Sequence, residues 1–227
     1  MQLSVELIPG RTPFPSGATA VIVDVLRATT SLTVALANGA RRVLEAASPD
    51  EAFARRDREP GALVCGEREG RKVPGFDLGN SPSEYGAAVV AGRTLVFAST
   101  NGSLAIRRAA GARRRLLAAF VNASAAAASL AGERRAVIVC AGKLGRFALE
   151  DALFAGWLCA RLEHDGARLE GAGATLARAL APRDADEVRR LVEGASHARY
   201  LRSLGPEAAA DVEFCSRLDV IPRAFTV

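Results

Sequence analysis

Residues 20–39, AVIVDVLRATTSLTVALANG, contain in one segment both elements from which the rest of the chain is built. The first six residues are apolar apart from Asp24 and rich in valine and isoleucine, which is typical of a strand buried on both faces. A short polar break follows, and the apolar residues after it predict a helix with Thr30 or Ser31 as its cap and Gly39 at its end. The segment is therefore expected to form a strand–loop–helix unit.

Three further units of the same kind follow. We expect strands at Thr94–Ala98, Leu116–Val121 and Ala136–Cys140, each followed by a small polar break and a helix. From about Gly173 onward the pattern predicts helices only. This alternation predicts an α/β fold, with a layered α/β/α sheet, repeated strand–loop–helix units and a helical C-terminal segment. No linker interrupts the pattern, so we predict one domain over residues 1–227.

Local signals mark further helices. Ser48 and Ser81 each precede a proline and are followed three residues later by a glutamate, which is typical of a capped helix start. A helix from about Ala148 to Leu162 has its apolar residues on one face. In the C-terminal segment we expect helices at Asp184–Val192 and Ala198–Leu204.

The segment CGEREGRKVPGFDLGNSP, from Cys65 to Pro82, differs from its surroundings because it is charged, rich in glycine and without periodicity. Long loops without structure of their own are uncommon in compact domains and are usually functional. A solvated surface excursion is the alternative. We expect this segment to be a loop that contributes to the functional site.

The charge balance excludes some partners. The 227-residue chain has a net charge of +5 but only two lysines, Lys72 and Lys143, and its arginines are scattered rather than clustered. Aromatic residues make up 5% of the chain, too few for the stacking surfaces of proteins that bind single-stranded nucleic acid. Because guanidinium groups form paired hydrogen bonds with phosphate and carboxylate, we predict a small anionic substrate and no nucleic acid partner.

The sequence also predicts where the protein works. Its start lacks the basic and apolar regions of a signal peptide, and no apolar run is long enough to span a bilayer. The four cysteines follow neither a zinc-binding nor a redox spacing. We therefore expect a reduced, cytoplasmic protein without a membrane partner.

Polar side chains follow the predicted strands at their carboxyl ends. They are Asp24, the run Ser99 to Gly102, Asn122 and the run Cys140 to Gly142. If the strands are parallel neighbours, these groups meet at one edge of the sheet, where ligands of open α/β sheets bind. Asn101 and Asn122 taken singly are also ordinary helix caps. Together the strand ends predict a site for an anionic small molecule.

The carboxylates near these strand ends suggest a metal. Asp24 lies inside an apolar run, so it needs a partner such as Arg27, a metal ion or a proton of the substrate. Glu67 and the adjacent Glu150 and Asp151 are the other candidates, although the last two also suit the first turn of a helix. Two or three carboxylates beside a phosphate are typical of a Mg²⁺ site.

The motif CAGKLGR, residues 140–146, has the cysteine-to-arginine spacing of the thiolate phosphatases. A thiolate mechanism needs an exposed Cys140 of low pKa with Arg146 holding the phosphate. No histidine precedes the cysteine, and cysteine is often a small buried hydrophobic residue. We expect Cys140 to be a packing residue and Arg146 to bind phosphate or sulfonate.

Six blocks of the chain together resemble the 2-phosphosulfolactate phosphatase family. They are VIVDVLRATTSLTVALANGA, GEREGRKVPGFDLGNSPSEY, STNGS, FVNASA, CAGKLGRFALEDALFAG and DVEFCSRLDVIP, in the order of the family from about Val21 to Pro222. The resemblance implies an α/β architecture and a Mg²⁺-dependent phosphatase. Such an enzyme hydrolyses 2-phospho-3-sulfolactate to sulfolactate and phosphate, a reaction of coenzyme M biosynthesis in methanogens. Another phosphorylated 2-hydroxy acid is an alternative substrate.

The roles of individual residues are hypotheses at this point. We expect the Mg²⁺ ligands among Asp24, Glu67, Glu150 and Asp151, and we assign Asp24, Arg27, Glu67 and Asn101 to catalysis. The expected substrate-binding residues are Arg27, Thr29, Thr30, Arg68, Asn80, Asn101, Gly102 and Arg146.

Two mechanisms and a rival function stay open. Either a metal-activated water attacks the phosphoryl group, or Asp24 attacks it directly and forms an aspartyl-phosphate. The alternative to an enzyme is a non-catalytic binding protein for small phosphorylated or sulfonated anions. A homodimer is compatible with both.

Overall fold

The computed structural model describes all 227 residues and contains two β-sheets. The larger sheet has the strand order β10-β7-β2-β8-β1-β9 and is parallel except at β10, which runs antiparallel to β7. Its strands in chain order are β1 (Gln2–Glu6), β2 (Thr19–Val23), β7 (Arg114–Ala118), β8 (Arg135–Cys140), β9 (Arg168–Glu170) and β10 (Phe225–Thr226).

The smaller sheet has the order β3-β6-β4-β5. Strands β3, β6 and β4 are parallel, and β5 forms an antiparallel hairpin with β4. Its strands are β3 (Arg42–Glu45), β4 (Leu63–Arg68), β5 (Arg71–Lys72) and β6 (Thr94–Ala98).

Ten α-helices surround the sheets. They are α1 (Ala28–Ala37), α2 (Pro49–Arg56), α3 (Ala87–Val90), α4 (Gly102–Arg108), α5 (Ala123–Ala128), α6 (Leu149–His164), α7 (Gly171–Ala179), α8 (Ala185–Gly194), α9 (Ser196–Ser203) and α10 (Pro206–Cys215). None of these helices combines the length and the apolar character needed to cross a lipid bilayer.

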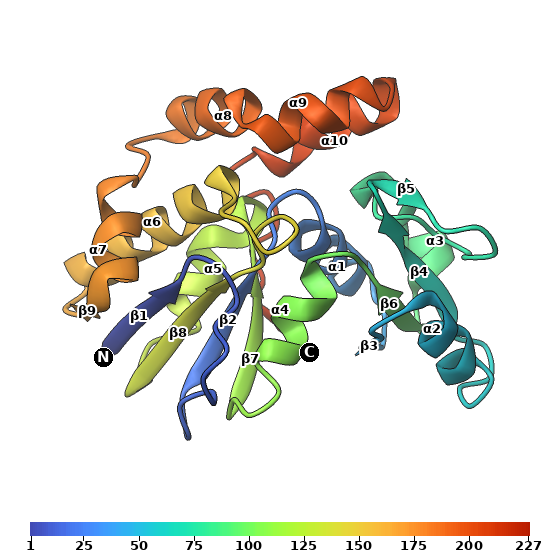
Figure 1. Cartoon of the computed structure of the whole chain (residues 1–227), viewed down its shortest axis with the longest axis horizontal. Coiled ribbons are helices and arrows are strands. Elements are labelled where there is room, and N and C mark those ends of the chain that lie inside the picture. The colour runs from blue at the N-terminus through green and yellow to red at the C-terminus, as the bar shows by residue number, and fades with distance from the viewer.

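The side chains of β2 show how the layers are built, because successive residues of a strand point to opposite faces. Val21 and Val23 belong to the core that the larger sheet forms with α5 and α6. Ile22 points the other way, into a core with Leu32 of α1 and Phe97 of β6. Helices α1 and α4 therefore lie between the two sheets, as Figure 1 shows, and α2 covers the far face of the smaller sheet.

The C-terminal helices α8, α9 and α10 form a separate layer across one end of the molecule (Figure 1). Val188, Ala198 and Val212 attach this layer to the core of the larger sheet. The predicted α/β class, the layered sheet and the helical C-terminal segment are thus confirmed. The expectation of helices only after Gly173 was wrong for β10, which returns to the larger sheet beside β7.

The division into two sheets was not predicted. Strands β2, β7 and β8 are parallel neighbours, but β6 belongs to the smaller sheet beside β4. The segment from Cys65 to Pro82 is not a structureless loop, because it begins within β4 and continues through β5. Its remainder runs irregularly back past β4, where Leu78 bridges Cys65.

One predicted helix cap was wrong, and another, Ser81, precedes a shorter helix than expected. Helix α1 begins at Ala28, so Thr30 and Ser31 lie inside it, and their hydroxyls donate to the carbonyl oxygens of Val25 and Asn80. Hydroxyls in the first turns of a helix can bond to nearby backbone in this way instead of capping. The start at Ser81 gives only a single 3₁₀ turn. Ser48 was predicted correctly, because its side chain accepts the Glu51 N–H at the start of α2.

Candidate active site

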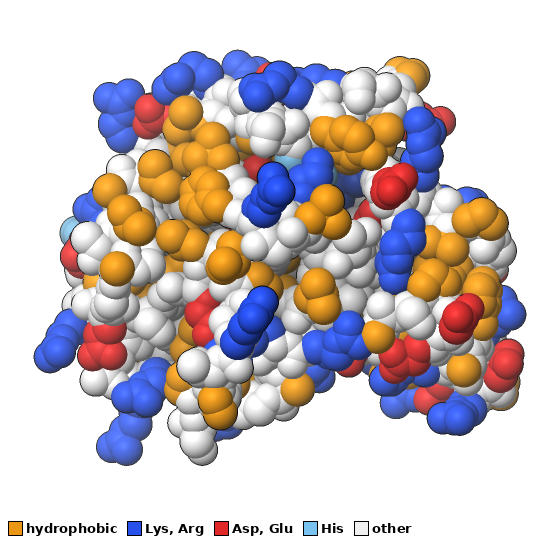
Figure 2. Space-filling view, viewed as in Figure 1, with side chains coloured by type: hydrophobic (Ala, Val, Ile, Leu, Met, Phe, Trp, Pro, Cys, Tyr) orange, Lys and Arg blue, Asp and Glu red, His pale blue; other side chains and the backbone are white.

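A cavity of about 390 Å³ lies beneath α9, where the two sheets and the C-terminal helices meet. Figure 2 shows a hollow below the C-terminal layer, bordered by basic and hydrophobic side chains. Five parts of the chain line the cavity: the β2–α1 connection (Asp24, Leu26, Arg27), the β4–β5 hairpin and the loop after it (Glu67, Glu69, Gly70, Asn80), the β6–α4 connection (Thr100, Asn101), the β8–α6 loop (Lys143, Leu144) and α9 (His197, Tyr200, Leu201).

Asp24 is the carboxylate at the end of β2, and it is only 7% exposed. Its Oδ1 accepts the Ala28 N–H at 3.2 Å, whereas its Oδ2 has no hydrogen-bond partner. Burial raises the pKa of Asp24 to about 6, the His197 charge opposes this, and Glu67 and Glu150 add to it. The pairing with Arg27, one of the alternatives that the sequence left open, does not occur. Asp24 therefore presents a free oxygen to the cavity. Its raised pKa means that this carboxyl group binds a proton at a pH closer to neutral than an ordinary aspartate does.

Gly102 is the residue that gives this oxygen room. A Cβ at this position would lie 3.0 Å from Asp24 Oδ2 and 2.5 Å from the Ala28 side chain. Glycine is therefore needed where the β6–α4 connection passes the end of β2. This role is steric, and it differs from the substrate contact predicted for Gly102.

Arg27 lines the cavity, but its guanidinium is already held. Nη1 donates to Asp211 Oδ2 at 2.6 Å and Nη2 donates to the Gly70 carbonyl at 2.6 Å. Asp211 also accepts the Ser81 hydroxyl at 2.6 Å. Because Arg27 and Asp211 are both buried, this pair fastens α10 and the β4–β5 hairpin to the start of α1.

Glu67 joins the smaller sheet to the β6–α4 connection. Its Oε1 accepts the Thr100 N–H and its Oε2 accepts the Gly70 N–H, both at 2.7 Å. Two other cavity-lining oxygens are orphaned, because Asn80 Oδ1 and Thr100 Oγ1 are buried without any hydrogen-bond partner. Buried polar atoms are nearly always satisfied, so these two oxygens are available to accept hydrogen bonds from a ligand.

Glu150 and Asp151 open α6, as predicted, but they have different surroundings. Asp151 accepts the Val25 N–H at 2.9 Å and the Gly142 N–H at 3.0 Å, so both oxygens hold strand-end backbone together. Burial raises the pKa of Asp151 well above its usual range. Glu150 Oε1 lies 3.0 Å from His197 Nδ1. Neither carboxylate lines the cavity.

The other predicted substrate-binding residues lie at or outside the edge of the site. Asn80 and Asn101 line the cavity, and Asn101 Oδ1 accepts the Leu144 N–H at 2.8 Å. Thr29 and Thr30 are buried and bonded to backbone carbonyls. Arg68 donates to the carbonyl oxygens of Glu67 and Ala47, Arg146 is exposed on a turn, and neither lines the cavity.

Cys140 has the packing role that we expected. It is fully buried at the end of β8, and burial raises the pKa of its thiol well above the usual range. A nucleophilic cysteine needs the opposite environment, exposed and electropositive.

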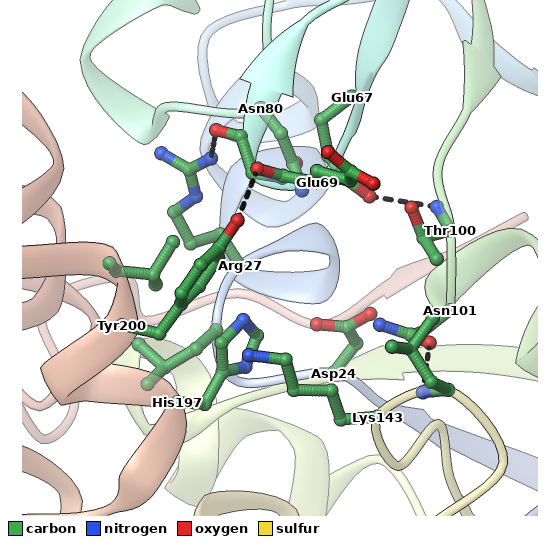
Figure 3. A pocket seen from close by; sticks show the side chains of 14 residues that line it. Asp24, Arg27, Glu67, Glu69, Asn80, Thr100, Asn101, Lys143, His197 and Tyr200 are labelled. Atoms are coloured by element: carbon green, nitrogen blue, oxygen red, sulfur yellow. Dashed lines mark hydrogen bonds between the residues drawn. The ribbon is translucent and has the colours of Figure 1, made fainter. Parts of the chain in front are cut away.

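Sequence reasoning missed Lys143, His197 and Tyr200. Figure 3 shows their side chains gathered on one side of the cavity, with Asp24 and Asn101 facing them. Lys143 was visible within CAGKLGR, between the two residues that drew attention there. His197 and Tyr200 carry no local signal, because only the packing of α9 over the strand ends brings them to the site.

The donor set can be tested for Mg²⁺. No three His, Cys, Asp or Glu side chains lie close enough to form a metal cage. Mg²⁺ usually takes one or two carboxylates and completes its shell with water and substrate phosphate. Asp24, with its free Oδ2, Glu67 and the two orphaned oxygens form an oxygen-only set of this kind. The residues present therefore fit Mg²⁺ held by Asp24 and Glu67 alone, out of the four carboxylates that the sequence suggested.

Comparisons with known proteins agree over almost the whole chain. Residues 3–226 match the family model described as 2-phosphosulpholactate phosphatase. A probable 2-phosphosulfolactate phosphatase of Thermotoga petrophila is 41% identical over 202 residues, which are 89% of this chain and 86% of the relative. Relatives of the same name in Symbiobacterium thermophilum and Deinococcus radiodurans are 41% and 38% identical, over 91% and 96% of this chain and 89% and 90% of their own length.

Proposed function

The chain belongs to the 2-phosphosulfolactate phosphatase family, and from this premise we propose that it is a Mg²⁺-dependent phosphatase. Its substrate is 2-phospho-3-sulfolactate or a related phosphorylated 2-hydroxy acid, and its products are the free hydroxy acid and phosphate. Residues 1–227 act as one catalytic domain in the cytoplasm. We propose that the sulfolactate formed in this way serves coenzyme M biosynthesis.

The observation that carries this proposal is the free oxygen of Asp24. It lies in a cavity that also contains two buried oxygens without partners, so the cavity offers three oxygens to a ligand that donates hydrogen bonds or carries positive charge. A hydrated Mg²⁺ together with a phosphate ester supplies both.

Asp24 and Glu67 would hold the ion. Mg²⁺ bound there would neutralise charge on the phosphoryl oxygens. Asp24 would hold the ion through Oδ2, its only oxygen without a hydrogen bond, and a bound cation would lower the raised pKa of this carboxyl. Glu67 cannot turn away from the site, since its two oxygens hold the backbone N–H groups of Thr100 and Gly70. Asn101, anchored through its Oδ1 to Leu144, has its amide N–H groups available for a phosphoryl oxygen.

The test is phosphate release from 2-phosphosulfolactate with Mg²⁺ and with EDTA. We expect activity only with Mg²⁺, and a fall in activity of about 100-fold or more in Asp24→Asn, because the variant loses a carboxylate ligand of the ion. The matched control is Asp186→Asn, because Asp186 is 94% exposed on α8 and remote from the cavity. Wild-type turnover in Asp24→Asn would remove Asp24 from the mechanism.

Two further outcomes separate the alternatives. Acid quenching during turnover of ³²P-labelled substrate should leave the protein unlabelled. If the wild-type protein is labelled and Asp24→Asn is not, Asp24 attacks the phosphoryl group directly. Saturable binding without turnover, across a panel of phosphorylated 2-hydroxy acids, would favour the non-catalytic binding protein.

A further inference from the structure

We propose that Lys143 binds the sulfonate of the substrate and that Tyr200 positions Lys143 for this contact. The proposal rests on the proposed function, because it names the residue that selects a sulfonated substrate among phosphorylated hydroxy acids.

The first step is a comparison of the cationic side chains in the cavity wall, which are Arg27, Lys143 and His197. Arg27 is neutralised by Asp211 at 2.6 Å, and His197 faces Glu150 at 3.0 Å. Lys143 forms neither an ion pair nor a hydrogen bond through its Nζ. It is therefore the one cation of the wall that has no anionic partner within the protein.

The second step is how Lys143 is held. Its Nζ lies 4.1 Å from the centre of the Tyr200 ring, within the range of a cation–π interaction. The Tyr200 hydroxyl in turn donates to the Glu69 carbonyl at 2.9 Å, which fixes the ring against the β4–β5 turn. Partial burial lowers the pKa of Lys143, and the charges of Glu150 and Glu67, neither of which forms an ion pair with Nζ, oppose this only in part. An anion bound in the cavity would replace the water that the Lys143 ammonium has lost.

The third step is which anionic group reaches it. Asp24 and Asn101 lie on the wall opposite Tyr200, and the phosphoryl group must be next to Asp24 to react (Figure 3). Tyr200 and Leu201 give the Lys143 side an apolar character. One ammonium matches the single charge of a sulfonate, and the apolar wall matches the methylene that carries it. The substrate therefore lies with its phosphate toward Asp24 and its sulfonate toward Lys143.

The kinetic test compares 2-phosphosulfolactate with 2-phospholactate, which lacks the sulfonate. In Lys143→Met we expect the ratio of kcat/KM for these two substrates to fall by about 10- to 100-fold, the usual worth of a hydrogen bond to a charged group. The change should lie in KM for the sulfonated substrate. Lys72→Met is the matched control, because Lys72 is the only other lysine and lies outside this cavity.

Tyr200 is tested through the same ratio. Tyr200→Phe keeps the ring, so it should retain most of the discrimination, whereas Tyr200→Leu should raise KM for the sulfonated substrate and leave kcat nearly as it was. An equal loss of kcat/KM for both substrates in Lys143→Met would mean that Lys143 binds the phosphate, and an unchanged ratio would mean that it binds neither. Both results overturn the proposal.

A binding test does not depend on turnover. In the Lys72→Met background Lys143 is the only lysine, so an amine-acylating reagent followed by peptide mass analysis reports on it alone. We expect sulfolactate to protect Lys143 from acylation and lactate to give no protection. Equal acylation with and without sulfolactate overturns the proposal. Absence of phosphate release by the wild-type protein, with protection preserved, would instead refute the proposed phosphatase activity alone.

Discussion

Asp24 combines deep burial with an unused oxygen, and this combination has opposite effects on function and on stability. A buried carboxylate without a cation is costly when ionised. The protein offsets this cost only in part, with one backbone N–H at Oδ1 and the charge of His197. Because the cost of burying the Asp24 charge is only partly offset, Asp24 has a raised affinity for a proton or a metal ion. We infer that the ionised Asp24 destabilises the metal-free protein.

Asp24→Asn should therefore stabilise the protein while it abolishes activity. The pKa of Asp24 is about 6 in the fold against the ordinary aspartate value of 3.8, so the folded state binds the proton more tightly than the unfolded chain. The free energy of unfolding then falls as pH rises from about 4 to 6, by about 3 kcal/mol in total. Urea unfolding in EDTA should show a larger advantage of Asp24→Asn at pH 8 than at pH 5, by about 1 kcal/mol.

The exposed Asp186→Asn serves as the control, and it should show no such pH dependence. If Asp24→Asn is less stable than the wild type at pH 8, the hydrogen bond from the Ala28 N–H to the Asp24 carboxylate contributes more to stability than the burial of its charge costs.

Single residues also show how far the sequence predicts the site. Asp24, Arg27, Glu67, Asn80 and Asn101 were chosen because they follow strands or lie in the glycine-rich segment, and all five line the cavity. This reasoning works because parallel strands end at the same edge of a sheet. The exposed Arg146 shows its limit, since spacing along a loop does not tell which way a side chain points.

At the scale of elements, strands with a continuous apolar sequence were predicted correctly, whereas short strands that mix apolar and charged residues were not. Strand β6 has the bounds Thr94–Ala98 that its β-branched and apolar residues predict. Strand β4 was missed because its run LVCGER ends in charged residues, although its middle is buried. Those charged residues are present because the strand ends in the site. The sequence pattern therefore failed at β4 for a functional reason.

Gly66 is what allows β4 and β6 to pair beside the site. Its φ is +132°, and a Cβ there would lie 1.9 Å from the Ala98 carbonyl oxygen on the neighbouring strand. Gly66→Ala must both adopt a strained backbone and separate the strands, so we expect a loss of about 3 kcal/mol or more in the free energy of unfolding. Urea unfolding curves measure this loss directly.

Gly61→Ala is the matched substitution, because Gly61 also has a positive φ, +81°, but open space around its position. We expect it to cost only the left-handed backbone penalty, about 1 kcal/mol. Equal losses for the two variants would show that the contact with Ala98 has no weight in the pairing of β4 with β6.

At the scale of the whole molecule, the site belongs to no single layer. The larger sheet supplies Asp24 and Lys143 from its strand ends, the smaller sheet supplies Glu67 and Thr100, and the C-terminal layer supplies Tyr200. Local patterns predicted strands β2, β6, β7 and β8 and helices α8 and α9, but not the other strands of the smaller sheet. They could not predict that α9 covers the strand ends, because this depends on packing between segments far apart in the chain.

A ligand in the cavity should therefore stabilise the whole molecule as one unit. Since substrate would contact both sheets and α9, it must dissociate before any of these parts unfolds. Asp24→Asn should consume 2-phosphosulfolactate far more slowly than the wild type, so it is the suitable form for thermal unfolding with Mg²⁺. At a ligand concentration 100 times Kd we expect stabilisation by about 2.7 kcal/mol, or a rise in Tm of about 5 to 10 °C. Lactate, which lacks both the phosphate and the sulfonate, should leave Tm unchanged. A melting curve that splits, with only one part shifted by the ligand, would mean that the substrate contacts one layer and that α9 is not part of the site.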